Sequence, residues 1–134
     1  MTEENVEIVR RFAECWVRSD WDGMNRLVDP DVELHATVGG VQEGRVRRGI
    51  DEIREDYEAD EETWEEHDIE IERLIDAGDR VVIFQHESMR GKTSGIGVES
   101  DLAVLVDLRD GRIVRVQGYI DRAAALEAAG VPAT

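Results

Sequence analysis

Residues 67–90 read HDIEIERLIDAGDRVVIFQHESMR, two runs rich in apolar residues on either side of the turn Ala77-Gly78-Asp79. Alternation of apolar and polar residues is typical of β-strands, and a short turn containing glycine joins antiparallel neighbours. The pattern continues along the chain, which predicts four strands: His67 to Ile75, Arg80 to Arg90, Gly97 to Leu108 and Arg112 to Ile120. We therefore expect a long antiparallel meander in the second half of the chain.

Helical spacing dominates the residues before this meander. From Thr2 to Ser19, apolar residues recur every three or four positions, as on one face of a helix. The next predicted elements are a short helix with Asp20 as its cap and Met24, Leu27 and Val28 on it, a strand from Val32 to Val38, and a helix from about Ile50 with Ile53 and Tyr57 facing inward. A last helix is expected from its N-cap Asp121 to Gly130.

This order of elements predicts an α+β fold in a single domain covering residues 1–134. We expect a strongly curved, mostly antiparallel sheet with three N-terminal helices on one face and a short helix at the end of the chain. The space between the concave face of such a sheet and its helices is a natural cavity.

Charge and composition exclude several classes of function. The 134 residues include 32 acidic and 16 basic side chains, a net charge of -16, so nucleic acid is not an expected partner. The longest apolar run, Leu102 to Val106, is too short to span a membrane, and the first residues lack the features of a signal peptide. A single cysteine and three scattered histidines predict no disulfide, no metal site and no cofactor. We expect a cytoplasmic protein.

Eleven acidic residues and one arginine lie between Asp51 and Asp68. A buried helix face could not hold so many unpaired charges, so these residues indicate a solvated surface. The alternative is a docking surface for a basic partner.

Several segments resemble the SnoaL-like group of the nuclear transport factor 2-like superfamily. They are SDWDG at 19–23, DPDVELH at 29–35, DAGDRVV at 76–82, RDGRIV at 109–114 and DRAAALEAAG at 121–130. The superfamily also includes ketosteroid isomerase, polyketide cyclases, limonene epoxide hydrolase and scytalone dehydratase. The resemblance implies a cone-shaped α+β barrel, with the curved sheet wrapped around the three N-terminal helices and a hydrophobic pocket inside, but this scaffold hosts several chemistries.

Catalytic residues of two of these enzymes are missing from the matching positions. Where ketosteroid isomerase has a base aspartate, a tyrosine and a second aspartate, this chain has Ala36, Phe12 and Val104, and only the supporting Tyr57 is kept. Where limonene epoxide hydrolase has an arginine and two aspartates, this chain has Gln85, Glu87 and Gly118, so only the carboxylate that activates water is kept, as Glu87. For the polyketide cyclases, His35 is a loose candidate.

Glu87 is the expected catalytic residue. Strand alternation places it with Gln85 on one face, which the resemblance assigns to the cavity, and a carboxylate there would suit general acid or base catalysis. The alternative places Glu87 near the mouth, solvated or paired with an arginine such as Arg90. Tyr57 is the expected hydrogen-bond donor, unless it only packs. His35 and His86 are expected on the convex face, and His67 on the surface.

The pocket should be mostly apolar and suit a small hydrophobic molecule, although the same side chains could close into a filled core. Its expected lining is Phe12, Trp16, Leu34, Ala36, Ile53, Gln85, Leu102, Val104, Val106, Val116, Gly118 and Ile120. At Gly118, the missing side chain either opens space or permits close backbone contact.

Apolar residues are also expected on the convex face, at Phe84, Ala103, Leu105 and Tyr119, with no obvious helix to cover them. A homodimer through this face is therefore predicted. For function, two hypotheses remain at this point. The protein is a cofactor-free isomerase, cyclase or hydrolase acting on a polyketide-, steroid- or terpenoid-like molecule, or it is a non-catalytic ligand-binding or dimerisation module.

Overall fold

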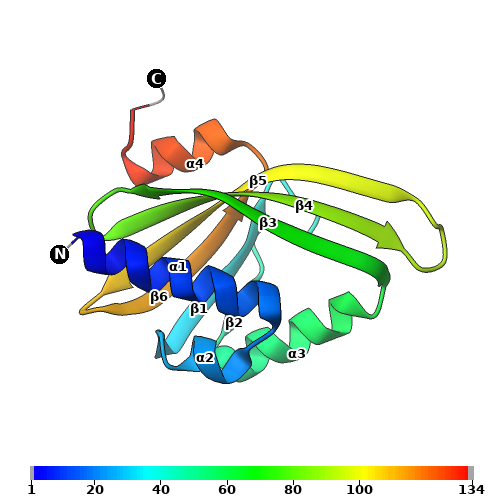
Figure 1. The fold of residues 1–134 in the computed structure, drawn as a ribbon, viewed down its shortest axis with the longest axis horizontal. Coiled ribbons are helices and arrows are strands. Elements are labelled where there is room, and N and C mark those ends of the chain that lie inside the picture. The colour runs from blue at the N-terminus through cyan, green and yellow to red at the C-terminus, as the bar shows by residue number, and fades with distance from the viewer. Residues whose placement is uncertain (1, 133–134) are drawn as a thin grey trace.

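A computed structural model describes residues 2–132, which form four helices and six strands (Figure 1). The helices are α1 (Thr2–Arg18), α2 (Trp21–Asn25), α3 (Ile50–Glu61) and α4 (Arg122–Ala129). The strands are β1 (Val28–Val38), β2 (Val46–Arg48), β3 (Trp64–Asp76), β4 (Arg80–Gly91), β5 (Gly97–Arg109) and β6 (Arg112–Tyr119). Within these residues, no helix is long and apolar enough to cross a membrane.

The strands form one mixed sheet in the order β2-β1-β6-β5-β4-β3. All neighbours are antiparallel except β1 and β6, which are parallel. The predicted α+β class, the curved sheet, the three N-terminal helices and the short last helix are confirmed. The sheet does not close into a complete barrel, because β2 and β3 form its two edges.

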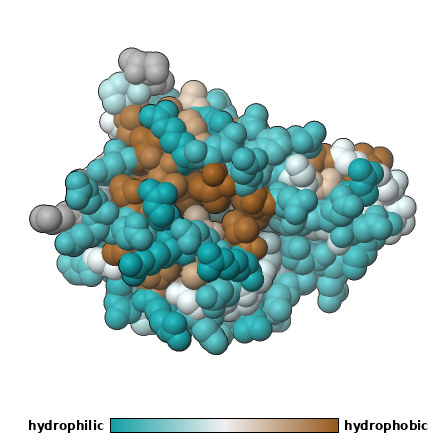
Figure 2. Space-filling model, viewed as in Figure 1, coloured by the Kyte–Doolittle hydropathy of each residue, from teal (hydrophilic) through white to brown (hydrophobic). Residues whose placement is uncertain are grey.

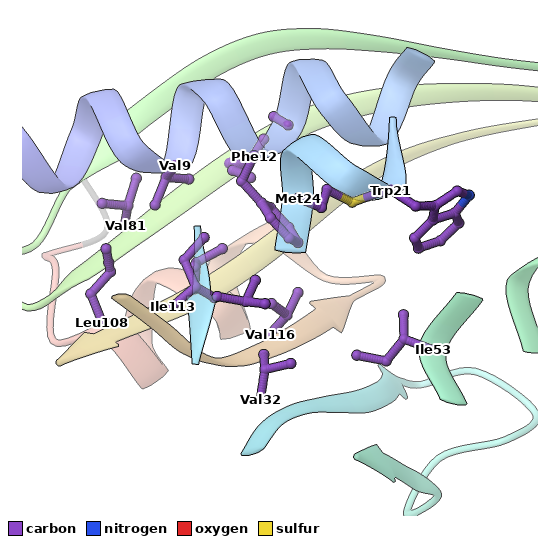
Figure 3. Close-up of a cluster of buried hydrophobic side chains, with 14 residues drawn as sticks. Val9, Phe12, Trp21, Met24, Val32, Ile53, Val81, Leu108, Ile113 and Val116 are labelled. Atoms are coloured by element: carbon purple, nitrogen blue, oxygen red, sulfur yellow. The ribbon is translucent and has the colours of Figure 1, made fainter. Parts of the chain in front are cut away.

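The main core lies between α1, α2 and the inner face of the sheet (Figure 3). Val9 and Phe12 on α1 and Met24 on α2 pack against strand residues such as Val81 and Ile113. The spacing of the apolar residues on α1 is what directs them to the sheet. Asp20 holds α2 in place by accepting a hydrogen bond of 2.9 Å from the Gly23 amide.

The outer face of the sheet carries α4, as Figure 1 shows. Asp121 caps the start of this helix, and Gly130 ends it in the left-handed conformation with a φ of 77°. Ala125 of α4 packs on Val82, Ala103 and Leu105, which are all buried. The expectation that no helix covers Ala103 and Leu105 is therefore wrong.

That correction removes two of the four apolar residues on which the predicted homodimer rested, Ala103 and Leu105. Partly exposed hydrophobic residues remain between α4 and the strands beneath it (Figure 2). Phe84 and Tyr119 are among these residues. The homodimer stays a prediction that rests on this smaller surface.

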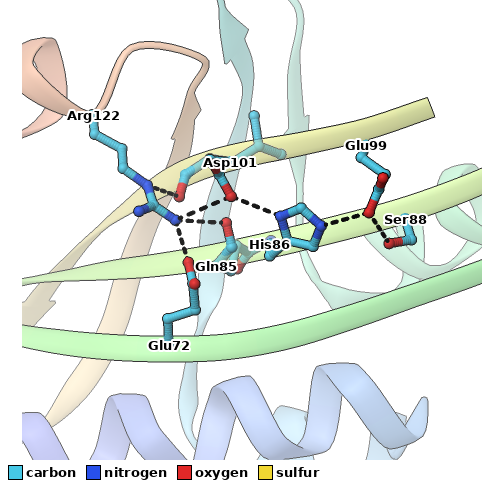
Figure 4. Close-up of polar contacts among 8 residues, drawn as sticks. Glu72, Gln85, His86, Ser88, Glu99, Asp101 and Arg122 are labelled. Carbon is cyan, nitrogen blue, oxygen red and sulfur yellow. Dashed lines mark hydrogen bonds and ion pairs between the residues drawn. The ribbon is translucent and has the colours of Figure 1, made fainter.

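Arg122, the first residue of α4, ties this helix to three strands (Figure 4). Its guanidinium donates hydrogen bonds to the carbonyl oxygens of Leu102 on β5, at 3.3 Å, and Gln85 on β4, at 3.1 Å. It also pairs with Glu72 on β3 and lies 4.5 Å from the centre of the Phe84 ring. The sequence offers no local pattern from which this contact could be predicted.

Several predicted boundaries differ from the structure. Helix α2 ends at Asn25, so Leu27 and Val28 lie outside it, and β1 begins at Val28 instead of Val32. Pro30 sits where the pairing of β1 with β6 is irregular, so its missing N–H breaks no regular ladder. Strand β2 was not predicted, because three residues are too few to show alternation. Strand β3 begins at Trp64, three residues before the predicted start.

Candidate functional site

A cavity of about 740 Å³ lies between the inner face of the sheet and helices α1 and α3. Among the predicted lining residues, it is bordered by Phe12, Trp16, Leu34, Ala36, Ile53, Gln85, Leu102, Val104, Val116 and Gly118. The alternative of a filled core does not apply to this part of the fold. The walls are mostly apolar, as in binding sites for small organic molecules.

Two predicted lining residues lie elsewhere. Val106 is fully buried in the main core, in the same cluster as Val9 and Phe12 of α1, and does not border the cavity. Ile120 follows the end of β6 and is 51% exposed, because the regular alternation of the strand has ended. Its side chain lies close to Gly39 instead.

An aromatic cluster forms the wall where α1 and α3 meet. The rings of Trp16 and Tyr57 are 4.9 Å apart and nearly perpendicular, and Trp21 packs edge-on against both. The Tyr57 ring lies 6.3 Å from the ring of His67. Burial and then the nearby Glu61 carboxylate raise the pKa of Tyr57 above its usual range. Its phenol therefore stays protonated at neutral pH and can donate a hydrogen bond.

Glu87 extends from β4 into the cavity with a side chain that is only 16% exposed. Gln85, two residues earlier on the same face, donates a hydrogen bond of 2.8 Å to Glu87 Oε1. The alternative of an ion pair with Arg90 does not occur, because Arg90 pairs with Glu66 at 3.7 Å and bonds to the Gly95 carbonyl. Among the described residues, the one cationic partner of Glu87 is His67.

His67 lies inside the cavity, so its predicted place on the surface is wrong. Its side chain is 8% exposed, Nδ1 contacts the Glu61 carboxylate, and Nε2 lies 3.7 Å from Glu87 Oε2. That second distance is too long for a hydrogen bond, so Nε2 has no hydrogen-bond partner within residues 2–132. The two carboxylates, Glu87 first and then Glu61, raise the pKa of His67 to about 9, although burial acts in the opposite direction.

A signal for His67 was present in the sequence. His67, Ile69 and Ile71 occupy alternate positions and pair with Met89, Glu87 and Gln85 of β4. The alternation therefore places His67 on the face that Glu87 occupies. The many acidic neighbours of His67 suggested a surface position. Those acidic residues occupy positions that alternate with His67 along the strand, so their side chains point to the opposite face.

His35 was expected on the convex face but is among the residues that border the cavity, and it does not join Glu87. Its Nε2 is 2.8 Å from Glu33 Oε1, a residue on the same side of β1. In addition, β6 and β5 separate β1 from the strand that carries Glu87. His86 lies on the outer face, as expected from alternation, between Asp101 and Glu99 (Figure 4).

Gly118 on β6 permits a close approach to β1. A Cβ atom at this position would lie 2.6 Å from Thr37 Oγ1, at the point where the pairing of β1 with β6 shifts. We expect Gly118→Ala to lower the free energy of unfolding by about 1–2 kcal/mol, because the added methyl overpacks the contact. Urea denaturation of this variant, and of the double variant with Thr37→Ala, checks the prediction. An unchanged loss in the double variant would contradict it.

The chain belongs to the SnoaL-like domain family. Residues 9–116, more than half of the chain, match that family. Within residues 2–132, no group of three or more histidine, cysteine or acidic side chains is arranged to hold a metal ion. A search of curated proteins found no match.

Solved structures of other SnoaL-like and related proteins share this fold. A putative SnoaL-like polyketide cyclase from Jannaschia sp. is 21% identical with a TM-score of 0.75, covering 98% of this chain and 95% of its own. A hypothetical protein from Catenulispora acidiphila with a ketosteroid isomerase-like fold, in complex with trimethylamine, is 21% identical with a TM-score of 0.71 and 94% coverage of both chains. TerC, co-crystallised with polyporic acid, is 22% identical with a TM-score of 0.75, and the match covers 95% of this chain and 98% of TerC.

Proposed function

We propose that this SnoaL-like protein binds a small hydrophobic molecule in the inner cavity and catalyses a cofactor-free proton transfer on it, as an isomerase, cyclase or hydrolase. The observation that carries the proposal is the position of Glu87, inside an apolar cavity, 3.7 Å from His67 Nε2 and away from any arginine of the described residues. The small molecules bound to the Catenulispora protein and to TerC support a ligand in this fold.

Each polar group has a distinct role in the proposed reaction. Glu87 accepts a proton from a carbon next to a carbonyl group, and the electron pair of the broken C–H bond moves onto the carbonyl oxygen. The Nε2–H of protonated His67, which has no hydrogen-bond partner among residues 2–132, and the Tyr57 hydroxyl stabilise that oxygen by hydrogen bonds. Return of the proton from Glu87 to another carbon completes an isomerisation. Alternatively, the carbanion attacks a second carbonyl carbon and forms a C–C bond, the electron pair of that C=O bond moves onto its oxygen, and Glu87 returns its proton to this oxygen, which completes a cyclisation.

Exchange of the α-protons of β-tetralone in deuterium oxide, followed by proton NMR, tests the proposal. We expect the protein to accelerate this exchange and Glu87→Gln to slow it by at least about a hundredfold, since the amide keeps the shape but not the basicity of the carboxylate. Glu66→Gln is the matched control, because Glu66 is exposed and pairs with Arg90. No acceleration by the unaltered protein, or equal rates in both variants, would favour the non-catalytic binding module.

A further inference from the structure

A second polar group lies in the cavity, on the edge strand β2. Arg47 pairs in register with Leu34 of β1, and Leu34 pairs with Val116 of β6. Residues that pair across neighbouring strands point to the same face, so Arg47 faces the cavity with the other two. Its side chain is 6% exposed. The structure therefore holds an arginine inside an otherwise mostly apolar wall.

The charge of Arg47 is incompletely balanced. Asp56 on α3 lies 2.6 Å from Arg47 Nε and 3.4 Å from Arg45 Nη2, so one carboxylate serves two guanidinium groups. The contact with Arg47 Nε is an ion pair and not a hydrogen bond, and Nε has no hydrogen-bond partner within residues 2–132. Arg47 Nη2 donates to the neutral Gln42 side chain at 2.9 Å.

A buried guanidinium with too few acceptors is costly, and an anionic group in the cavity would provide them. The net charge of -16 repels anions in general, so an acidic ligand needs a local cationic site of this kind. We propose that the natural ligand is an amphiphilic acid whose acidic group binds Arg47, while its hydrophobic body lies along the aromatic wall. This inference rests on the proposed function, because it assumes that the inner cavity holds the ligand.

Two fluorescent probes with the same ring system test the proposal. Phenylnaphthylamine is neutral, and anilinonaphthalene sulfonate adds one anionic group, so fluorescence titration with both probes separates hydrophobic binding from recognition of the charge. We expect Arg47→Met to weaken sulfonate binding roughly tenfold and to leave the neutral probe within about twofold. Arg48→Met is the matched control, because Arg48 is the next residue on β2 but is exposed and pairs with Glu33. It should change neither affinity.

Asp56→Asn provides a second variant that does not remove the arginine. Removing this carboxylate leaves Arg47 and Arg45 without their shared ion-pair partner, so the sulfonate should bind about threefold more tightly. The affinity for the neutral probe should not change. Equal changes for both probes in Arg47→Met, or weaker sulfonate binding in Asp56→Asn, would overturn the proposal. If the neutral probe itself fails to bind the unaltered protein, the proposed function fails instead.

Discussion

Replacing His67 with glutamine is expected to lower the free energy of unfolding by about 3 kcal/mol near pH 6, and by much less above about pH 9. Folding raises the pKa of His67 from 6.5 to about 9. The folded chain therefore holds the proton more tightly than the unfolded chain does. This stabilisation is complete below pH 6.5, declines between pH 6.5 and 9, and is lost at higher pH. Urea denaturation of both proteins across this range measures the difference.

His86→Gln is the matched control for this prediction. His86 also lies between two carboxylates, and Asp101 first and then Glu99 raise its pKa, so the effect has the same sign. These groups are exposed on the outer face, and added salt should suppress their contribution much more than that of the buried pair. A pH-independent difference for His67→Gln would contradict the proposed charge on His67.

Met24→Ala should destabilise the protein by about 3 kcal/mol without changing the pH dependence. Met24 on α2 is fully buried and belongs to the same hydrophobic cluster as Phe12 and Ile113 (Figure 3). Its removal leaves a cavity beside α2, which the Asp20 cap and the buried Trp21 hold in place. Thermal and urea denaturation should report the same loss.

Met89→Ala is the matched control, because Met89 is a partly exposed methionine on β4 that borders the inner cavity. Truncating it enlarges a space that is already open, so the expected loss is below about 1 kcal/mol. Equal losses at Met24 and Met89 would show that α2 repacks freely around the deleted side chain.

Much of the fold could be predicted because its signals are local. The spacing of Val9, Phe12 and Trp16 defines α1, and alternation together with glycine turns defines the hairpins. Asp121 begins α4 because its side chain accepts a hydrogen bond from the Ala123 amide, and Gly130 ends it with its backbone N–H. Each of these features depends on residues a few positions apart, which the sequence presents directly.

Features that join distant segments could not be predicted in the same way. Where α4 docks depends on Arg122 reaching carbonyl groups 20 and 37 positions away. The ion pair of Arg47 with Asp56 connects β2 to α3. Strand β2 is too short to show any periodicity, and the acidic residues of α3 suggested a solvated surface. Of the candidate site, Glu87 and Tyr57 were predicted as cavity residues, whereas His67 and Arg47 were missed.

Helix α3 contributes to both polar ends of the cavity, with Asp56 beside Arg47 and with Tyr57 and Glu61 beside His67. The strands carry Arg47, His67 and Glu87 together with much of the apolar wall, and they share their backbone hydrogen bonds with neighbouring strands, so substitutions there disturb the whole sheet. Substitutions on one face of a single helix change what the cavity recognises at little cost to that sheet. Divergence of ligand preference among descendants of this chain is therefore expected to concentrate in α3, while the sheet is inherited unchanged.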